Sequence, residues 1–214
     1  MSGYFKTGPQ QYAAGDRFLG IRVPAIRKLA RACHSLSFED LDRLLKSRWH
    51  EERLLALVIL VERHRKSSLE EKKTLCRFYL SRTSSINNWD LVDISAGQIV
   101  GGTLDPNHID ELERLAHSTC LWERRIAIIA TSFWIRQAIV SPTLYIAGLL
   151  VADPHDLIHK AVGWMLREVG KKDMAALQDF LDRYLVTIPR TMLRYAIERF
   201  PEPLRQQYLQ ARFR

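Results

Sequence analysis

EERLLALVILVERHRK, residues 51–66, predicts one long helix with a broad apolar face, and this stretch decides the fold class. The stretch ends in basic residues, which suit the negative end of a helix dipole. Its wholly apolar part, residues 54–61, is eight residues long and therefore too short to span a bilayer. We expect a buried helix of a protein that does not enter a membrane.

Helical periodicity continues on both sides of this stretch, from Pro24 almost to the end of the chain. Pro24 suits the first turn of a helix through residues 25–34. Ser37, followed three positions later by Asp40, is typical of a cap before a second helix. The connectors are short and carry Pro, Asn, Asp or Gly, and no alternating pattern of strand type lies between them. The sequence therefore predicts an all-α protein.

Several of the more apolar helices share a polar residue followed three positions later by Ala or Gly. The pattern occurs at residues 53–56, 93–96, 124–127 and 160–163, and Ala196 extends the series. The small residues are 40, 31, 36 and 33 positions apart, the range of two-helix solenoid repeats. Stacked helix pairs of this kind curve and form a concave face. The alternative is an irregular helical domain in which the matches are accidental.

Charge and cysteine content narrow the classes of function. The chain has 214 residues with 32 Lys and Arg against 24 Asp and Glu, a formal charge of +8. This favours an acidic partner, nucleic acid first and a membrane surface second. Three cysteines without CxxC spacing fit reduced thiols, and the N-terminus lacks the apolar run of a signal peptide. We expect a soluble cytoplasmic protein, with one domain or a compact repeat array over residues 1–214.

Known catalytic and metal-binding motifs are missing from the sequence. His155 and His159 could share a helix face, but there is no HExxH and no third ligand nearby, so we expect no metal. GxSxG, GxGxxG and a Walker lysine loop do not occur either. We expect the other histidines on the surface or in caps, and Gly101 and Gly102 at the end of a helix. These other histidines are His34, His50, His64, His108 and His117.

The segment SSINNWDLVDISAGQIVGG, residues 84–102, combines an indole with two carboxylates at a helix start. Trp89 and Asp93 are four residues apart, so helical spacing makes them neighbours on one face. Asp90 points elsewhere and suits the helix N-terminus. In the repeat pattern Asp93 takes a slot that is basic in the other three matches, which suggests a specific role. The alternative is a half-buried aspartate that holds a loop or an arginine.

Basic residues of the later helices are candidates for contact with a nucleic acid backbone. Arg124 and Arg125 are adjacent and must project differently, so that one could meet Asp93 or a phosphate. Lys160 takes the same position in the repeat pattern as Arg124, three residues before the small residue. Residues 183–214 carry seven arginines, Arg190 and Arg194 among them, which could follow a DNA backbone. A charge run of this kind can also be a solvated face.

The five tryptophans differ in their surroundings. Trp134 lies within an apolar run and is expected in the core. Trp164 directly follows Gly163 in KAVGWMLRE, one residue beyond the slot aligned with Ala127. It therefore points differently from the small residues of the repeat.

Four segments resemble the AlkD-type DNA alkylation repair proteins, which are DNA glycosylases built from HEAT-like repeats. The segments are FLGIRVPAIRKL (18–29), NNWDLVD (87–93), LWERRIAI (121–128) and KAVGWMLREVG (160–170). They occur in the right order and cover nearly the whole chain. WDxVD and KAxGWxLRE are the specific parts of the match.

The resemblance implies a curved solenoid of HEAT-like two-helix repeats that grips duplex DNA on a basic concave surface. It implies base excision repair of positively charged alkylated purines, 3-methyladenine and 7-methylguanine, without metal or cofactor and without flipping the lesion into a pocket. The protein would act as a monomer on the DNA of the nucleoid, away from membranes. Family members carry a further N-terminal helix, so either the first repeat is truncated or the start of the chain is misplaced.

Site residues follow from the resemblance position by position. The catalytic aspartate falls on Asp93, and the two sugar-contacting tryptophans fall on Trp89 and Trp164. The active-site arginine falls on Arg125, with Arg124 as the one-residue alternative, and a DNA-facing tyrosine falls on Tyr4.

The chemistry of the implied reaction explains these residue types. A cationic base leaves readily, and the electron-poor sugar that remains is stabilised by a carboxylate that can also position water. Indole faces add cation–π attraction of roughly 0.5–2 kcal/mol each, and a nearby arginine would help to keep Asp93 ionised.

Two other functions are compatible with the same sequence. One is a DNA-binding solenoid without catalytic activity that recognises damaged or branched DNA. The other is a protein-interaction scaffold, as many helical repeat proteins are.

Overall fold

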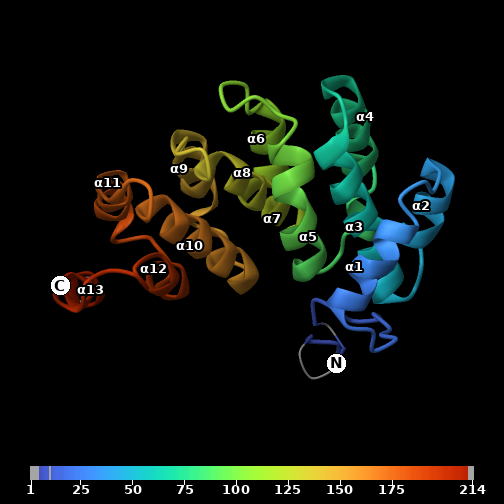
Figure 1. Ribbon diagram of the computed structural model, residues 1–214. Coiled ribbons are helices and arrows are strands. Elements are labelled where there is room, and N and C mark those ends of the chain that lie inside the picture. The colour runs from blue at the N-terminus through green and yellow to red at the C-terminus, as the bar shows by residue number, and fades with distance from the viewer. Residues whose placement is uncertain (1–4, 10, 212–214) are drawn as a thin grey trace. The chain divides into compact units, whose positions relative to one another are not determined.

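The computed structural model describes residues 5–9 and 11–211, and Figure 1 shows their helices. Across these residues every regular element is a helix, and the one extended pairing is an isolated bridge between Arg17 and Trp49. The all-α prediction is therefore confirmed. No described helix combines the length and the apolar character that crossing a membrane requires. Tyr4 lies outside the described residues.

The helices form two compact units, Met1–Thr103 and Leu104–Arg214. The prediction of a single repeat domain over residues 1–214 stays a prediction. The first unit contains α1 (Val23–Ala32), α2 (Phe38–Leu45), α3 (His50–Lys66), α4 (Leu69–Leu80), the 3₁₀ turn η1 (Thr83–Ser85), α5 (Trp89–Ala96) and the π-helical turn η2 (Gly97–Gly101).

Helix α3, the stretch on which the prediction of the fold was based, is the core of the first unit. It packs against α1, α2, α4 and α5. Leu57, Ile59 and Leu60 are fully buried, on different sides of the helix. A helix with apolar residues on more than one side has to be covered all round, which explains its central place.

Two histidines of α3 correct the expectation that they lie on the surface or in caps, because His50 and His64 are both buried and bonded to side chains of other segments. The His64 ring lies between Gln98, whose amide donates to Nδ1 at 3.2 Å, and Thr103, which accepts from Nε2 at 2.7 Å. Burial, together with the charge of Lys72, lowers the pKa of His64 to about 4. This histidine is a neutral hydrogen-bonding residue of the core.

The helix that starts at Trp89 changes its hydrogen bonding before it ends. Helix α5 stops at Ala96, and the backbone N–H of Gly102 donates to the carbonyl of Gly97, five residues earlier, at 3.1 Å. Gly102 closes the segment as predicted, but in a right-handed conformation with φ −76°. Wider π-helical turns of this kind are frequent at functional sites.

The second unit is organised around α10. Its helices are α6 (Asp110–Ala116), α7 (Leu121–Ala130), α8 (Ser132–Ile135), α9 (Ser141–Leu150), α10 (Asp156–Gly170), α11 (Met174–Tyr184), α12 (Arg190–Ala196) and α13 (Glu202–Ala211). Helix α10 packs against α7, α8, α9, α11 and α12. Trp134 is in the core of this unit, as expected, and is 2% exposed.

Gly163 allows α10 and α12 to approach each other closely. A methyl group at this position would lie 2.5 Å from the carbonyl oxygen of Met192 and 2.6 Å from Cβ of Tyr195. Both neighbours are fixed parts of α12, so neither can turn away. The expected function of the small residues, close helix approach, is therefore present at this position.

The same hydrogen bond opens three of the core helices. In α3 and α7 the fourth residue, Arg53 or Arg124, donates from Nη1 to the carbonyl six residues earlier, at 2.8 and 3.0 Å. In α10 the fourth residue is His159, whose Nε2 bonds to the carbonyl six residues earlier at 2.5 Å. A shared local structure at the start of separate helices supports the prediction of repeats.

The shared helix starts also correct the predicted alignment by one residue. Arg53 and Arg124 are fourth residues, whereas Asp93 and Lys160 are the fifth residues of α5 and α10. The residue of α7 that matches Asp93 is therefore Arg125. Asp93 remains an acid in a column that is basic in α7 and α10. The predicted alignment was shifted because the small residue does not have the same position in all four helices. It is the seventh residue in α3 and α7 and the eighth residue in α5 and α10.

We predict that Gly163→Ala destabilises the protein by about 1–3 kcal/mol, because the added methyl group forces α12 away from α10. The free energy of unfolding, measured by urea denaturation, checks this. Gly148→Ala in α9 is the matched control, since its methyl group would meet only the hydroxyl end of Tyr184, at 2.9 Å. Equal stability of the two variants would contradict the close approach.

Candidate nucleic-acid interface

Trp89 is the first residue of α5 and is half-buried. The side chain of Asn88 accepts a hydrogen bond from its backbone N–H at 2.8 Å, which starts the helix. The indole Nε1–H donates to the hydroxyl of Tyr12 at 3.2 Å, and the ring of Phe5 lies 5.5 Å away between centroids. Tyr12 was not selected from the sequence, because a contact over 77 residues leaves no local pattern.

Asp93 lies one helical turn after Trp89, as the spacing predicted, and is half-buried. It borders a cavity of about 400 Å³ in the first unit, formed by α1, α3 and α5. The lining combines arginines, carboxylates and apolar side chains: Arg27, Arg31, Arg65, Asp93, Glu62, Val58, Val61 and Ile94. The carboxylate of Asp93 is thus set among positive charges and close to apolar surface.

The three arginines of this cavity are site candidates that the sequence prediction missed. Arg27 and Arg31 are exposed and lie one turn apart on α1. Arg65 is bonded to Glu62 across 2.9 Å. The i,i+4 spacing of Arg27 and Arg31 was a usable signal, since it places both side chains on one face of a helix. Exposed arginines at this spacing are suited to phosphate groups.

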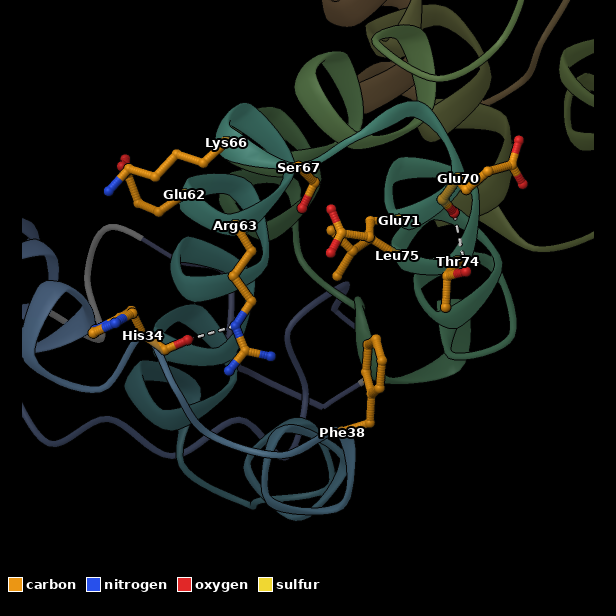
Figure 2. A pocket seen from close by; sticks show the side chains of 10 residues that line it. All are labelled: His34, Phe38, Glu62, Arg63, Lys66, Ser67, Glu70, Glu71, Thr74 and Leu75. Carbon is orange, nitrogen blue, oxygen red and sulfur yellow. Dashed lines mark hydrogen bonds between the residues drawn. The ribbon is translucent and has the colours of Figure 1, made fainter.

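A second, larger cavity of about 590 Å³ lies on the α2, α3 and α4 side of the first unit (Figure 2). Arg63 projects into it and donates from Nε to the carbonyl of His34 at 2.6 Å, while Phe38 and Leu75 supply apolar surface. The residues selected from the sequence as site candidates are not among those that line this cavity.

A buried charged cluster lies beneath the first turn of α5. Arg53 donates from Nη2 to Asp16 at 2.6 Å, and the amide of Asn88 donates to the same carboxylate at 3.1 Å. His50 contacts Asp16 through Nδ1 at 3.4 Å and Asp90 through Nε2 at 2.7 Å. Asp90 therefore does more than suit the helix dipole: it joins α5 to the histidine.

Both nitrogens of His50 face carboxylates, and only the imidazolium form can donate to both. Burial opposes a charge at this position, but the hydrogen bonds and charges of Asp16 and Asp90 prevail and raise the pKa of His50 to about 9. For Asp16, burial is likewise outweighed by the bond to His50 and the charge of Arg53, which together lower its pKa. His50 and Asp16 are therefore both ionised at neutral pH.

The loop before α1 is fixed by a further buried carboxylate. Glu51 accepts hydrogen bonds from the backbone N–H groups of Leu19 and Gly20, both at 2.9 Å. Gly20 has φ +81°, a conformation that favours glycine. The ring of Phe18 stacks on Phe5 at 5.0 Å. The segment FLGIRVP is thus held against α3 and the aromatic residues near Trp89.

The two adjacent arginines of α7 have different surroundings in the second unit. Arg124 forms an ion pair with Asp153 at 2.6 Å and also donates to backbone carbonyls. Arg125 is 5% exposed and donates to the carbonyl of Leu157 at 2.6 Å. Arg124 thus occupies the structural position that Arg53 occupies in α3, while Arg125 occupies the column of Asp93.

Helix α10 repeats the spacing of α5. Lys160 and Trp164 are four residues apart and neither is fully buried, so they share one face of α10, but here the tryptophan follows the charged residue, whereas on α5 Trp89 precedes Asp93. Lys160 forms an exposed ion pair with Asp156 at 2.7 Å. Such pairs contribute little to stability and can be exchanged for another anion.

The two candidate arginines of α12 are engaged differently. Arg190 donates to the carbonyl of Leu209 at 2.8 Å, which ties α12 to α13. Arg194 is exposed in the last turn of α12. Of the two side chains, Arg194 is the more accessible to a phosphate.

His155 and His159, which were considered as metal ligands and not expected to be any, have structural roles. His155 accepts a hydrogen bond from the backbone N–H of Leu157 at 3.1 Å, and so caps α10. His159 bonds to the carbonyl of Asp153. Over residues 5–9 and 11–211 there is no group of three or more His, Cys, Asp or Glu side chains that could hold a metal ion.

Comparison with known proteins places this chain in a family. The model of the family described as "DNA alkylation repair enzyme" matches residues 1–200. No curated protein matches the chain. The family match spans both compact units and includes all the site candidates discussed above.

Three solved structures with the same fold, among others, come from Enterococcus faecalis and Streptococcus mutans. A predicted DNA alkylation repair enzyme from Enterococcus faecalis is 18% identical, with a TM-score of 0.69 over 94% of this chain and 93% of that one. AlkD2 from Streptococcus mutans is 15% identical, with a TM-score of 0.64 over 85% and 91%. The protein smu.31 from Streptococcus mutans UA159 is 16% identical, with a TM-score of 0.62 over 81% and 89%. These likenesses confirm the helical repeat fold.

We predict that stability falls on both sides of about pH 6.5. The pKa of His50 is raised on folding, so its contribution is complete below pH 6.5 and is lost between pH 6.5 and 9, about 3 kcal/mol in all. The pKa of His64 is lowered, so its contribution is lost as the pH falls from 6.5 towards 4. Urea denaturation at a series of pH values measures both effects.

Two variants separate these effects. His50→Gln should flatten the alkaline side of the stability profile and leave the acid side, whereas His64→Gln should do the reverse. An alkaline decline of wild-type size in His50→Gln would assign that decline to another group.

Proposed function

Because the chain belongs to the family of DNA alkylation repair enzymes, we propose that it is a DNA glycosylase for positively charged alkylated purines. The substrates would be 3-methyladenine and 7-methylguanine in duplex DNA. One observation carries the proposal: Asp93 is half-buried, one turn from the partly exposed indole of Trp89, in a cavity that contains three arginines. This combination of charges suits an enzyme that stabilises a cationic sugar beside a phosphate backbone.

The proposed reaction breaks the bond between C1′ of the sugar and the nitrogen of the base. The bonding electrons leave with the base, which becomes neutral, so a strong general acid is not required. Positive charge develops on the sugar, and the carboxylate of Asp93 stabilises it. Water then bonds to C1′ and loses a proton, for which Asp93 is the acceptor in this proposal.

The tryptophans would act through their ring faces. Trp89 is fixed by Tyr12 and Phe5, so its plane is set before a substrate arrives. Trp164 would supply a second indole from α10, and Arg125 would add a positive charge near the phosphates. Cation–π attraction of roughly 0.5–2 kcal/mol for each ring favours a cationic over a neutral base.

Basic side chains would hold the DNA backbone. Arg27 and Arg31 on α1, Lys160 on α10 and Arg194 on α12 are exposed or partly exposed. With a formal charge of +8, the chain as a whole attracts a polyanion. Arg124 and Arg190 have backbone or carboxylate partners, and we propose that they mainly hold the helices in place.

A DNA-binding protein without base release is the second candidate. The observation that favours it is the engagement of Trp89 by Tyr12 and Phe5, which gives this indole a structural role independent of a substrate. This alternative predicts salt-sensitive binding to duplex DNA that is unchanged by Asp93→Asn.

We predict that Asp93→Asn lowers the rate of 7-methylguanine release from a duplex oligonucleotide by about 100-fold or more, because the carboxylate charge is removed. Glu62→Gln is the matched control. It removes the other carboxylate of the same cavity, which is bonded to Arg65, and should change the rate little.

Release of free base, separated by chromatography, is compared with spontaneous depurination. If the wild-type protein releases no more base than buffer does, the glycosylase proposal is wrong. If both variants lose activity equally, the rate of base release depends on the total charge of the cavity and not on Asp93 in particular.

We predict that Arg27→Ala and Arg31→Ala each weaken binding to undamaged duplex DNA and reduce the slope of log K against log salt by about 0.9. Each change removes one phosphate contact of the proposed interface. Fluorescence anisotropy over a series of salt concentrations gives the slope. Arg43→Ala on α2, which removes an exposed arginine paired with Glu39, is the control and should leave the slope unchanged. A slope equal to that of the wild type in the α1 variants would exclude this surface from the interface.

A further inference from the structure

Three segments that are far apart in the sequence meet at His50. Asp16 comes from the segment before α1, His50 from the start of α3 and Asp90 from the first turn of α5. The imidazole lies between the two carboxylates, 3.4 Å from Asp16 and 2.7 Å from Asp90. The side chains of His50, Asp16 and Asp90 are 3%, 5% and 21% exposed, so water competes little for these bonds. The bridge is therefore a specific link between α5 and the N-terminal segment.

Asp90 depends on His50 for its link to the rest of the unit. Its Oδ2 accepts from His50, whereas Oδ1 is buried and has no hydrogen-bond partner within the described part of the chain. Neutral His50 can donate through only one nitrogen and carries no charge, so above its pKa its bond to the largely buried carboxylate of Asp90 is weakened or lost, which is costly. Asp90 would then move towards water, and the first turn of α5 would move with it.

A change in the protonation of His50 can affect Trp89 in two ways. Trp89 is the residue directly before Asp90, so the two share one turn of backbone. The ring of Phe5 also connects them, since it lies 5.1 Å from the ring of His50 and 5.5 Å from that of Trp89. A change at His50 therefore alters both the backbone and the ring packing of Trp89.

We propose that His50 is a positioning residue, which fixes the first turn of α5 against the N-terminal segment and so sets the orientation of Trp89. His50 touches neither DNA nor reacting atoms. It acts through Asp90 and Phe5. The effect on catalysis rests on the proposed function, whereas the effect on Trp89 does not. Asp93, one turn further along α5, is placed by the same link.

The charged groups around His50 make this a pH-dependent link. Asp16 faces it from the N-terminal segment and Asp90 from α5, while Arg53 and Glu51 are neighbours on α3. Arg53 is bonded to Asp16, and Glu51 is turned to the loop before α1. The pKa of His50, raised to about 9, implies that the link is charge-assisted at neutral pH and weakens in alkaline solution.

Tryptophan fluorescence tests the positioning without any enzymatic activity. The signal of Trp89 is the difference between the wild-type protein and Trp89→Phe. We expect this fluorescence to change with a midpoint near pH 9. Above that pH we expect iodide to quench the fluorescence of Trp89 more strongly. In His50→Gln the transition should be missing and the quenching high at every pH. A Trp89 signal that is flat in the wild type, or titrates equally in His50→Gln, would overturn the proposal.

Two further variants keep the test decisive. If circular dichroism shows that His50→Gln is unfolded, Asp90→Asn takes its place, because it keeps the pair of His50 with Asp16 and removes the charged link to α5. It should raise the quenching of Trp89 at neutral pH, and quenching equal to the wild type would overturn the proposal. His64→Gln, which alters the other buried histidine of α3, should leave the transition near pH 9 in place.

Base release adds the functional readout. We expect kcat in His50→Gln to fall on the order of tenfold, since misplacement of a reacting group by a fraction of an ångström has effects of this size. We expect the kcat of the wild-type protein to decline near pH 9 and this decline to be missing in His50→Gln. If the wild-type protein releases no base, the proposed function fails, and the fluorescence experiment still decides the role of His50. Wild-type kcat and pH profile in His50→Gln would show that Trp89 needs no positioning.

Discussion

A basic side chain in the fourth position of a helix, turned back to the carbonyl six residues earlier, is the interaction on which both compact units depend. In α3 and α7 it is an arginine that also forms an ion pair, a buried one between Arg53 and Asp16 and a partly buried one between Arg124 and Asp153. Removal of one partner of such a pair would leave an uncompensated charge, so neither position is free to vary alone. The helix start is fixed as a result, and the direction of the fifth residue is fixed with it. In α7 this fifth residue is Arg125, and the fifth residues of α5 and α10 are Asp93 and Lys160.

The features that could be predicted from the sequence are those that local spacing controls. The capping box of Ser37 and Asp40 is present at α2, and Pro24 lies in the first turn of α1. Trp89 and Asp93 share a helix face because a helical turn of 3.6 residues requires it. Close approach at Gly163 could also be anticipated, since a glycine in an apolar helix has few other uses.

The features that could not be predicted depend on contacts between distant segments. His50 was expected on the surface or in a cap because nothing near it in the sequence shows that Asp16 and Asp90 enclose it, 34 and 40 residues away. Tyr12 was missed for the same reason. The alignment of the repeats was wrong by one residue because small side chains occur at two adjacent positions, and only the hydrogen bonds at the helix starts decide between them.

The hydrogen bond between Trp89 and Tyr12 has a consequence for discrimination between ligands. An indole has a single donor, and that of Trp89 is already engaged within the protein. The ring can therefore present only its face and its carbon edges to a bound molecule. Such a surface detects charge and flatness but cannot distinguish one pattern of donors and acceptors from another. A site built around it would tolerate different purines and would discriminate between damaged and normal bases by their charge alone.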